Sequence, residues 1–185
     1  EQPNDFYEAL ARGVEAASSR YGGEEFALAF GGNEMPGYHT GPASHTGHLV
    51  GGRHGHLDNA GYSVDQKVLV EKHLSPGELA ESLLKEESWR QILSSLVICF
   101  FAREIYGKET VLDCLRSAGI DLGEEELLAM GRTIHREKTR FKTREGFSFD
   151  NLRIPRRIFE VDSPVTFLSE EYIRETIDHV KKALV

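Results

Sequence analysis

The chain has 185 residues, a mass of 20.8 kDa and 39% hydrophobic residues, which predicts one globular domain or two small ones and excludes a disordered chain. Its longest apolar run, residues 96–102, is shorter than the roughly 20 residues that a membrane-spanning helix needs, and no basic and then apolar leader opens the sequence, so we expect neither a membrane protein nor a secreted one. The net charge of −8 disfavours binding to nucleic acid because an acidic protein repels phosphate.

The first third of the chain changes character near residue 31. Apolar residues recur at three- and four-residue spacing over residues 4–18, which predicts an amphipathic helix, and a second short helix is expected over residues 24–30. Residues 31–62 are rich in Gly and His, and we expect them to form an irregular loop segment.

Helical periodicity returns at Ser75, where Ser, Pro76 and Glu78 form the pattern of a capped helix start. Further helices are predicted over residues 89–106, 109–117, 124–140 and 169–184, the first of them apolar on most sides and therefore central. The predicted fold class is all-α and multihelical, with two small lobes: residues 1–74, part of a helical domain with the Gly/His-rich loop segment, and residues 75–185, a C-terminal multihelical domain.

Five of the eight histidines lie within eighteen positions, near three carboxylates: His39, His45, His48, His54 and His56, with Glu34, Asp58 and Asp65. Imidazole and carboxylate groups are ordinary ligands of zinc and iron, but these spacings match no metal-binding template. We therefore expect most of these histidines to bond backbone groups or to face solvent, and a small His-rich metal-binding protein is one alternative.

The two cysteines, Cys99 and Cys114, are too few for a disulfide framework, which indicates a reducing compartment and a cytoplasmic protein. Each lies among apolar residues of a predicted helix, where a free cysteine is most often a small buried hydrophobe. The segment from Arg132 to Arg157 contains nine basic residues and only three acidic ones. This excess of positive charge indicates either a solvated helix face or a surface for an anionic cofactor or partner.

Four motifs follow one another along nearly the whole chain. They are residues 25–27 (EFA) with 32–38 (GNEMPGY), residues 53–57 (RHGHL), residues 94–102 (SSLVICFFA), and residues 143–147 (TREGF) with 155–157 (PRR). Together they resemble the C-terminal helical domains of the tungsten-containing aldehyde ferredoxin oxidoreductase family. The resemblance implies oxidation of aldehydes to carboxylic acids, with a tungsten-bispterin and a [4Fe-4S] cluster as cofactors in the complete protein, and with electrons passed to ferredoxin.

The resemblance also implies roles for particular residues. Cys99 stands where the family has its fourth cluster ligand, and His56 where it has an active-site histidine, with His54 as a rival because the spacing from Arg53 differs by one residue. Arg53 is expected to neutralise a pterin phosphate or to pair with a pterin edge. A pterin is also expected to lie against three residues of the third motif, Ser94, Ile98 and Phe100.

The sequence departs from the family pattern at two positions of the third motif. Ser94 stands where the family has an aspartate that bonds a pterin ring, and Val97 where it has a glycine that lets the backbone come close. The family's β-rich N-terminal domain and its Cys-x-x-Cys-x-x-x-Cys motif have no counterpart among these residues, so the chain can supply one cluster ligand at most.

We therefore expect the C-terminal portion of such an oxidoreductase, inactive and without cofactor by itself. Its partners would be the N-terminal cofactor-binding part of the same enzyme or a separate subunit, ferredoxin and an aldehyde, and a homo-oligomer is compatible with the sequence. The main alternative is a non-catalytic helical subunit or interaction module that keeps the family fold, which the departures at Ser94 and Val97 favour.

Overall fold

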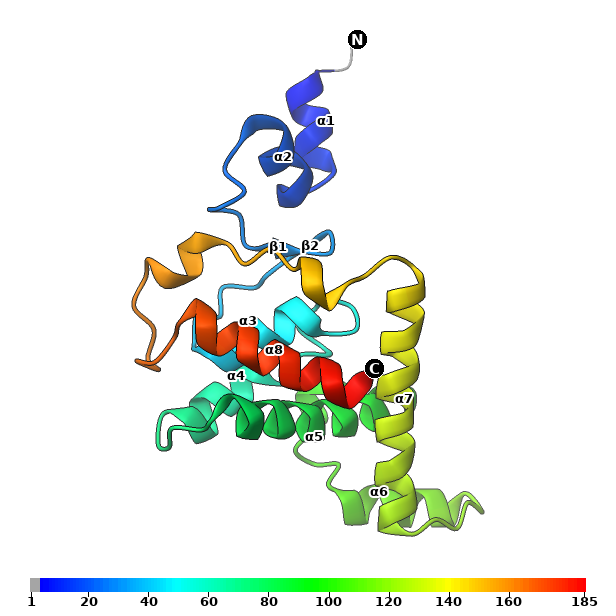
Figure 1. The fold of residues 1–185 in the computed structure, drawn as a ribbon. Coiled ribbons are helices and arrows are strands. Elements are labelled where there is room, and N and C mark those ends of the chain that lie inside the picture. Colours follow the sequence, from blue (N-terminus) through cyan, green and yellow to red (C-terminus); the bar gives the residue numbers. More distant parts are fainter. Residues whose placement is uncertain (1–3) are drawn as a thin grey trace.

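Eight α-helices and one pair of two-residue strands make up residues 4–185, the part of the chain that the computed structural model describes (Figure 1). The strands β1 (Ala29–Phe30) and β2 (Asn33–Glu34) pair in antiparallel fashion around a two-glycine turn. The predicted all-α fold class is therefore confirmed. Within residues 4–185 no helix has both the length and the apolar character needed to cross a membrane.

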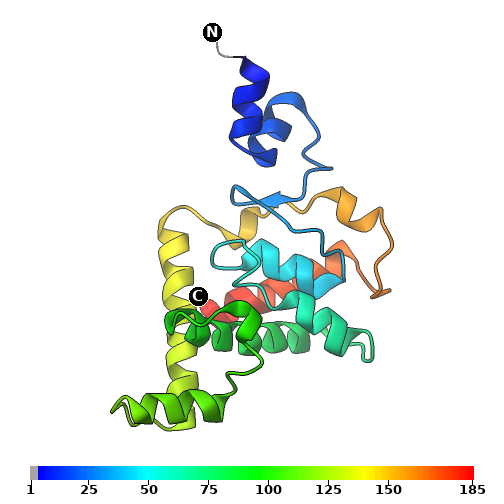
Figure 2. The same ribbon diagram turned by 180° about the vertical axis from the view of Figure 1, so that it is seen from behind.

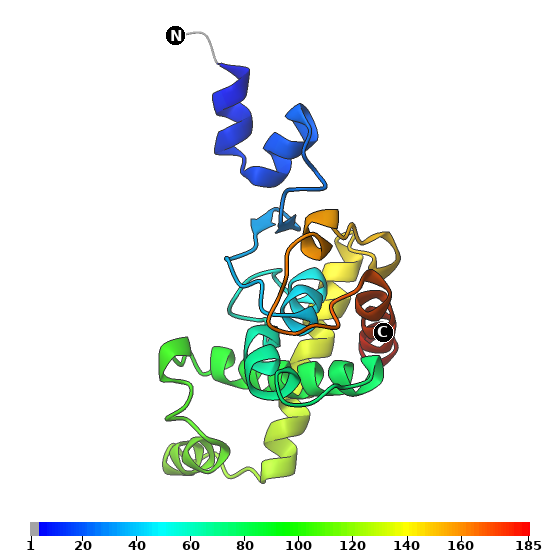
Figure 3. The same cartoon turned by 90° about the vertical axis from the view of Figure 1, so that its left-hand side faces the viewer.

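The N-terminal region contains two short helices, α1 (Asp5–Ala11) and α2 (Val14–Tyr21), where we predicted one. The chain breaks between them at Gly13, whose φ of +97° is a left-handed conformation that ends a helix easily only at glycine. The two helices project from the remainder of the molecule (Figures 1 and 3). The helix predicted over residues 24–30 is also wrong, because a turn after Gly23 leads directly into β1.

The Gly/His-rich segment contains a helix, α3 (Pro42–Val50), and every residue of that helix is buried. The irregular loop predicted for residues 31–62 is therefore wrong over this stretch. Asp65 accepts hydrogen bonds from the backbone N–H groups of Ala43 and Ser44 at 3.0 and 2.9 Å, and so satisfies the first turn of α3. Burial raises the pKa of Asp65 to about 6, against the opposing effect of these hydrogen bonds.

A short helix, α4 (Gly61–Val64), crosses α3 and continues into a π-helical turn, Asp65–Leu69. A Cβ atom on Gly61 would lie 2.0 Å from the carbonyl oxygen of Ala43, and one on Gly47 would lie 2.0 Å from Oδ1 of Asn59. Gly61 therefore permits a close approach of two backbones, and Gly47 permits the buried side chain of Asn59 to lie against α3, which explains why a glycine-rich segment forms helices here.

The longest helices lie in the second half of the chain. The helix α5 (Pro76–Ser95) begins at the predicted capping box of Ser75 and Glu78, and α6 (Lys108–Ser117), α7 (Glu124–Arg144) and α8 (Glu170–Leu184) lie close to their predicted positions. The prediction of one helix over residues 89–106 is wrong. Its first part belongs to α5, and the remainder is irregular apart from a 3₁₀ turn at Phe100–Ala102.

The helix α5 packs against α7 and α8, while α3 lies between α4 and α8. One apolar cluster joins Leu49 and Val50 of α3 to Ala80 of α5 and to Ile173 and Ile177 of α8. A separate cluster at the far end of α5 contains residues of α6 and α7. The division into residues 1–74 and 75–185 stays a prediction about domain organisation.

Candidate functional site

A cavity of about 250 Å³ opens where α5 ends. It is lined by Leu57, Arg90, Leu93, Ser94, Ile98, Cys99 and Phe100. Four of these, Ser94, Ile98, Cys99 and Phe100, are site residues expected from the family resemblance. The irregular segment that follows α5 forms one wall, and Figure 2 shows this segment, in green, in front of α5.

The end of α5 sets the direction of this wall. The N–H of Ile98 donates to the carbonyl of Leu93 at 3.0 Å and the N–H of Val97 donates to that of Ser94 at 3.1 Å, which is the bonding pattern of a Schellman C-cap. Val97 occupies the left-handed position of this cap with a φ of +58°, where glycine is the usual residue. The reversal turns Cys99 outward at the cavity.

Replacement of Val97 with glycine is expected to stabilise the fold by about 1 kcal/mol, because a β-branched residue is strained at positive φ. The side chain is 90% exposed, so its removal forfeits little apolar burial. Urea unfolding followed by circular dichroism measures the change. Val70→Gly is the matched control, because Val70 is also exposed but has a φ of −69°, and that variant should be destabilised. Equal destabilisation of both variants would contradict strain at Val97.

Cys99 and Cys114 are both exposed, so the expectation that each is buried is wrong. Cys99 leaves the apolar interior because α5 stops at Ser95, and Cys114 lies on the outer face of α6. Only Cys99 of the two lines the cavity.

His56 reaches the cavity through Phe100. The ring centroids of His56 and Phe100 are 5.2 Å apart. The His56 ring also packs against Tyr38, with the two ring centroids 5.0 Å apart. Burial, and then the positive charges of Arg90 and Arg103, lower the pKa of His56 below its ordinary value. A neutral imidazole at this position is able to accept a proton.

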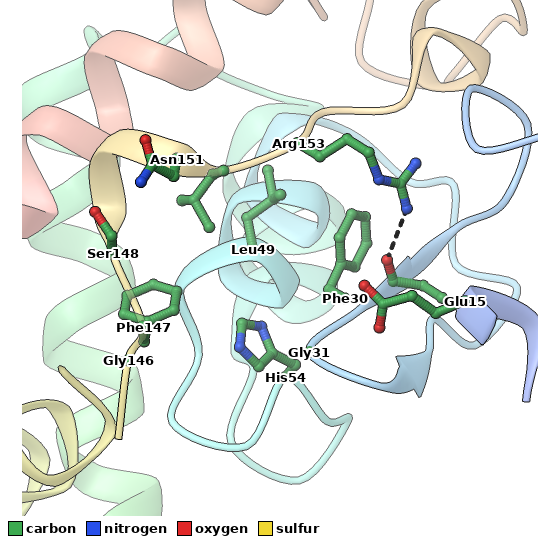
Figure 4. Close-up of a pocket in the computed structure, with 12 residues that line it drawn as sticks. Glu15, Phe30, Gly31, Leu49, His54, Gly146, Phe147, Ser148, Asn151 and Arg153 are labelled. Atoms are coloured by element: carbon green, nitrogen blue, oxygen red, sulfur yellow. Dashed lines mark hydrogen bonds between the residues drawn. The ribbon is translucent and has the colours of Figure 1, made fainter. Parts of the chain in front are cut away.

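The rival histidine, His54, faces a different cavity of about 270 Å³ (Figure 4). Its Nδ1 is 2.9 Å from the backbone oxygen of His48, to which it donates, and its ring lies beside Gly31 and Phe147. The structure therefore brings His56, and not His54, together with the residues around Cys99.

Arg53 lies apart from the cavity that contains Cys99. Its guanidinium binds the buried carboxylate of Asp58 through two hydrogen bonds of 2.6 and 2.8 Å, and the side chain lines a separate cavity against α7. The positive charge beside Phe100 comes instead from Arg90 and Arg103, whose guanidinium carbons lie 4.9 and 4.3 Å from its ring centroid. No motif in the sequence singled out these two arginines.

The remaining histidines of the Gly/His segment bond within the fold. Nδ1 of His48 is 2.8 Å from the carbonyl oxygen of Ser44. Nδ1 of His39 is 2.9 Å from Nε2 of His45, and Nε2 of His39 is 2.8 Å from the carbonyl oxygen of Val161. The expectation of backbone bonds is confirmed for His39, His48 and His54. Across residues 4–185, no three His, Cys, Asp or Glu side chains lie close enough together to hold a metal ion.

A group of buried titratable side chains on α5 and α7 was not predicted. Burial raises the pKa of Glu87 to about 8, and lowers the pKa of His135 to about 4 and that of Lys142 to about 7. Oε2 of Glu87 and Nε2 of His135 are 3.7 Å apart. The sequence signal for the burial of Glu87 was its spacing, because Glu87 follows Leu79 and Leu83 at four-residue intervals on the buried stripe of α5.

The similarity of the chain to known proteins lies at the level of a family. The family model described as "Aldehyde ferredoxin oxidoreductase, domains 2 & 3" matches residues 2–183. No curated protein and no solved structure matches the chain.

Proposed function

Because the chain belongs to the aldehyde ferredoxin oxidoreductase family, we propose that it is the C-terminal portion of a tungsten-pterin, iron-sulfur aldehyde:ferredoxin oxidoreductase. The complete enzyme would convert an aldehyde and water to a carboxylic acid and two protons, and two electrons would pass to ferredoxin. The chain alone is inactive in this proposal, since the cofactor-binding part of the enzyme is a separate domain or subunit.

One observation carries the proposal: an outward-facing Cys99 at the mouth of a cavity, with His56 one aromatic ring away. A free cysteine without a ligand role is more often buried. An exposed thiol beside a cavity is accessible to a metal centre on a second surface.

The donor set fits one ligand of a shared cluster. A [4Fe-4S] cluster is held by four thiolates, and among residues 4–185 Cys99 is the only cysteine at the cavity. Three ligands would therefore come from the N-terminal part of the enzyme, and Cys99 would supply the fourth.

The cavity also fits part of an anionic organic cofactor. Its walls are mainly apolar, and the buried Nε of Arg90 has no hydrogen-bond partner among the described residues. Ser94, Ile98 and Phe100 would lie against the pterin, whose metal supplies the two-electron chemistry when bound. His56 would hold or accept a proton near the reacting carbonyl.

The irregular segment after α5 offers a surface for the cofactor-binding part. Val97, Phe101 and Ile105 expose 90, 87 and 71% of their surface, although each is apolar. Large exposed apolar side chains gathered in one short segment are typical of protein interfaces. We infer that this segment, which also carries Cys99, contacts the N-terminal part.

The proposal predicts that cluster and activity appear only in the assembled protein. The chain alone should bind no stoichiometric four-iron cluster and oxidise no aldehyde, because one thiolate cannot replace four. Co-expression with the N-terminal cofactor-binding part should yield a complex with both properties, measured by iron and sulfide analysis and by aldehyde-dependent reduction of a viologen dye.

Two results would contradict this function. A stoichiometric [4Fe-4S] cluster on the chain alone would show that the ligand set is complete without a partner. A stable complex that lacks cluster and activity would favour the non-catalytic helical subunit, for which the departures at Ser94 and Val97 are the supporting observations.

A further inference from the structure

Two positive side chains converge on the ring of Phe100, and both Phe100 and one of the two, Arg90, line the Cys99 cavity. The guanidinium carbon of Arg90 lies 4.9 Å from the ring centroid of Phe100, and that of Arg103 lies 4.3 Å from the same centroid. Like charges repel, so two guanidinium groups gathered at one ring favour a negatively charged ligand between or beside them.

Arg90 is held rigidly but is incompletely bonded. Its side chain is only 4% exposed, and its two terminal nitrogens donate to the carbonyl of Asn59 and, at 3.2 Å, to the hydroxyl of Ser63. Its Nε forms an ion pair with the carboxylate of Glu86 at 3.8 Å, a distance too long for a hydrogen bond, and it has no hydrogen-bond partner among the described residues. A buried donor left without a partner is unfavourable, and a ligand oxygen would satisfy it.

Arg103 supplies a second, more accessible group. One of its terminal nitrogens donates to the carbonyl of Phe100 at 3.0 Å, which fixes the side chain over the ring. The other guanidinium nitrogens of Arg103 make no hydrogen bond or ion pair with residues 4–185, and they stay available to an external acceptor.

We propose that Arg90 and Arg103 form an oxyanion-binding site beside Phe100, and that the apolar cavity next to it holds the body of the same ligand. Guanidinium groups bind carboxylate and phosphate oxygens through strong charge-assisted hydrogen bonds. Leu57, Leu93 and Ile98 line the cavity of about 250 Å³ that would receive the apolar part. The ligand is therefore an organic carboxylate or phosphate.

Two candidate ligands carry such an oxyanion, and the choice of these two rests on the proposed function. One is the carboxylic acid that aldehyde oxidation produces, and the other is a phosphate group of an anionic cofactor. The site itself depends only on the two arginines and the cavity, so its test needs neither cluster nor activity.

The test uses the chain alone, labelled with ¹⁵N, and titrates inorganic phosphate or sodium benzoate at constant ionic strength. The Nε–H resonance of Arg90 should shift with saturation at roughly millimolar anion, because that group gains its missing acceptor. Tighter binding of benzoate identifies the carboxylate, whereas tighter binding of phosphate identifies the cofactor group; either result supports the site.

Variants separate the site from general charge effects. Arg103→Gln should weaken anion binding by roughly tenfold or more, since a charge-assisted bond is lost. Arg12→Gln removes an equally charged, exposed arginine next to α1 and should leave binding unchanged. Arg103 is not buried, so this variant is expected to fold, and Arg90→Lys tests the buried position with its charge kept.

The absence of a saturable shift with either anion overturns the proposal. So does equal binding by the Arg103→Gln and Arg12→Gln variants. Neither result alters the expected cluster in the assembled enzyme, because Cys99 takes no part in anion binding here.

Discussion

Replacement of Gly61 with alanine is expected to destabilise the protein by about 3 kcal/mol or more. The added Cβ would lie 2.0 Å from the carbonyl oxygen of Ala43 and 2.5 Å from the N–H nitrogen of Ser44. Both neighbours are backbone atoms in the first turn of α3, so relief of the clash requires movement of a whole buried helix.

Urea unfolding followed by circular dichroism at the helical band measures this effect. Gly37→Ala is the matched control, because a Cβ atom on Gly37 would meet no atom within 4 Å and its φ is not positive, and that variant should be within about 0.5 kcal/mol of the parent. A similar stability for the two variants would mean that α3 and α4 do not approach as closely as the structure indicates.

The helices that could be predicted from sequence are those with a polar face and a local start signal. Ser75 with Glu78 begins α5, and Ser169 begins α8 by accepting the N–H of Tyr172. Both signals depend on neighbours three residues apart, so they can be read without knowledge of the rest of the fold.

The helix α3 lacks such signals because it is buried on every side. Its sequence, PASHTGHLV, has no apolar stripe, and its first turn is satisfied by Asp65 from more than twenty residues further along the chain. The glycines that suggested a loop serve close contacts that exist only in the folded protein. A burial pattern of this kind can be found only from tertiary structure.

The error over residues 89–106 has a different cause. Sequence periodicity assumes that apolar residues face the core of the same chain. Here the left-handed Val97 ends α5, and Phe101 and Ile105 face outward. In our proposed function, these residues are apolar because they contact another part of the enzyme, and not because they continue a central helix.

The candidate site was only partly predictable. The family motif placed Ser94, Ile98, Cys99 and Phe100 within one short stretch of sequence, and local continuity brings them to one cavity. A difference of one residue in spacing left His54 and His56 unresolved, and the side-chain directions separate them. Arg53 was expected at a pterin because of its motif, whereas a buried Asp58 binds it in the structure.

Removal of the thiol by Cys99→Ala is expected to abolish the [4Fe-4S] signal and electron transfer to ferredoxin in the assembled enzyme. A cluster with three thiolate ligands is incomplete, and its loss interrupts the route of electrons out of the site. The stability of the folded chain should change by less than about 0.5 kcal/mol, because Cys99 is exposed and its side chain makes no hydrogen bond with residues 4–185.

Electron paramagnetic resonance of the reduced complex measures the cluster, and circular dichroism checks that the helices remain. Cys114→Ala is the matched control, since Cys114 is also exposed but lies on α6 and outside the cavity, so its variant should keep the full signal. An unchanged cluster in the Cys99→Ala complex would refute the ligand role of Cys99. Loss of the signal in both variants would instead show that the cluster depends on both exposed thiols. The position of Cys99 at the cavity would then no longer support its assignment as the cluster ligand.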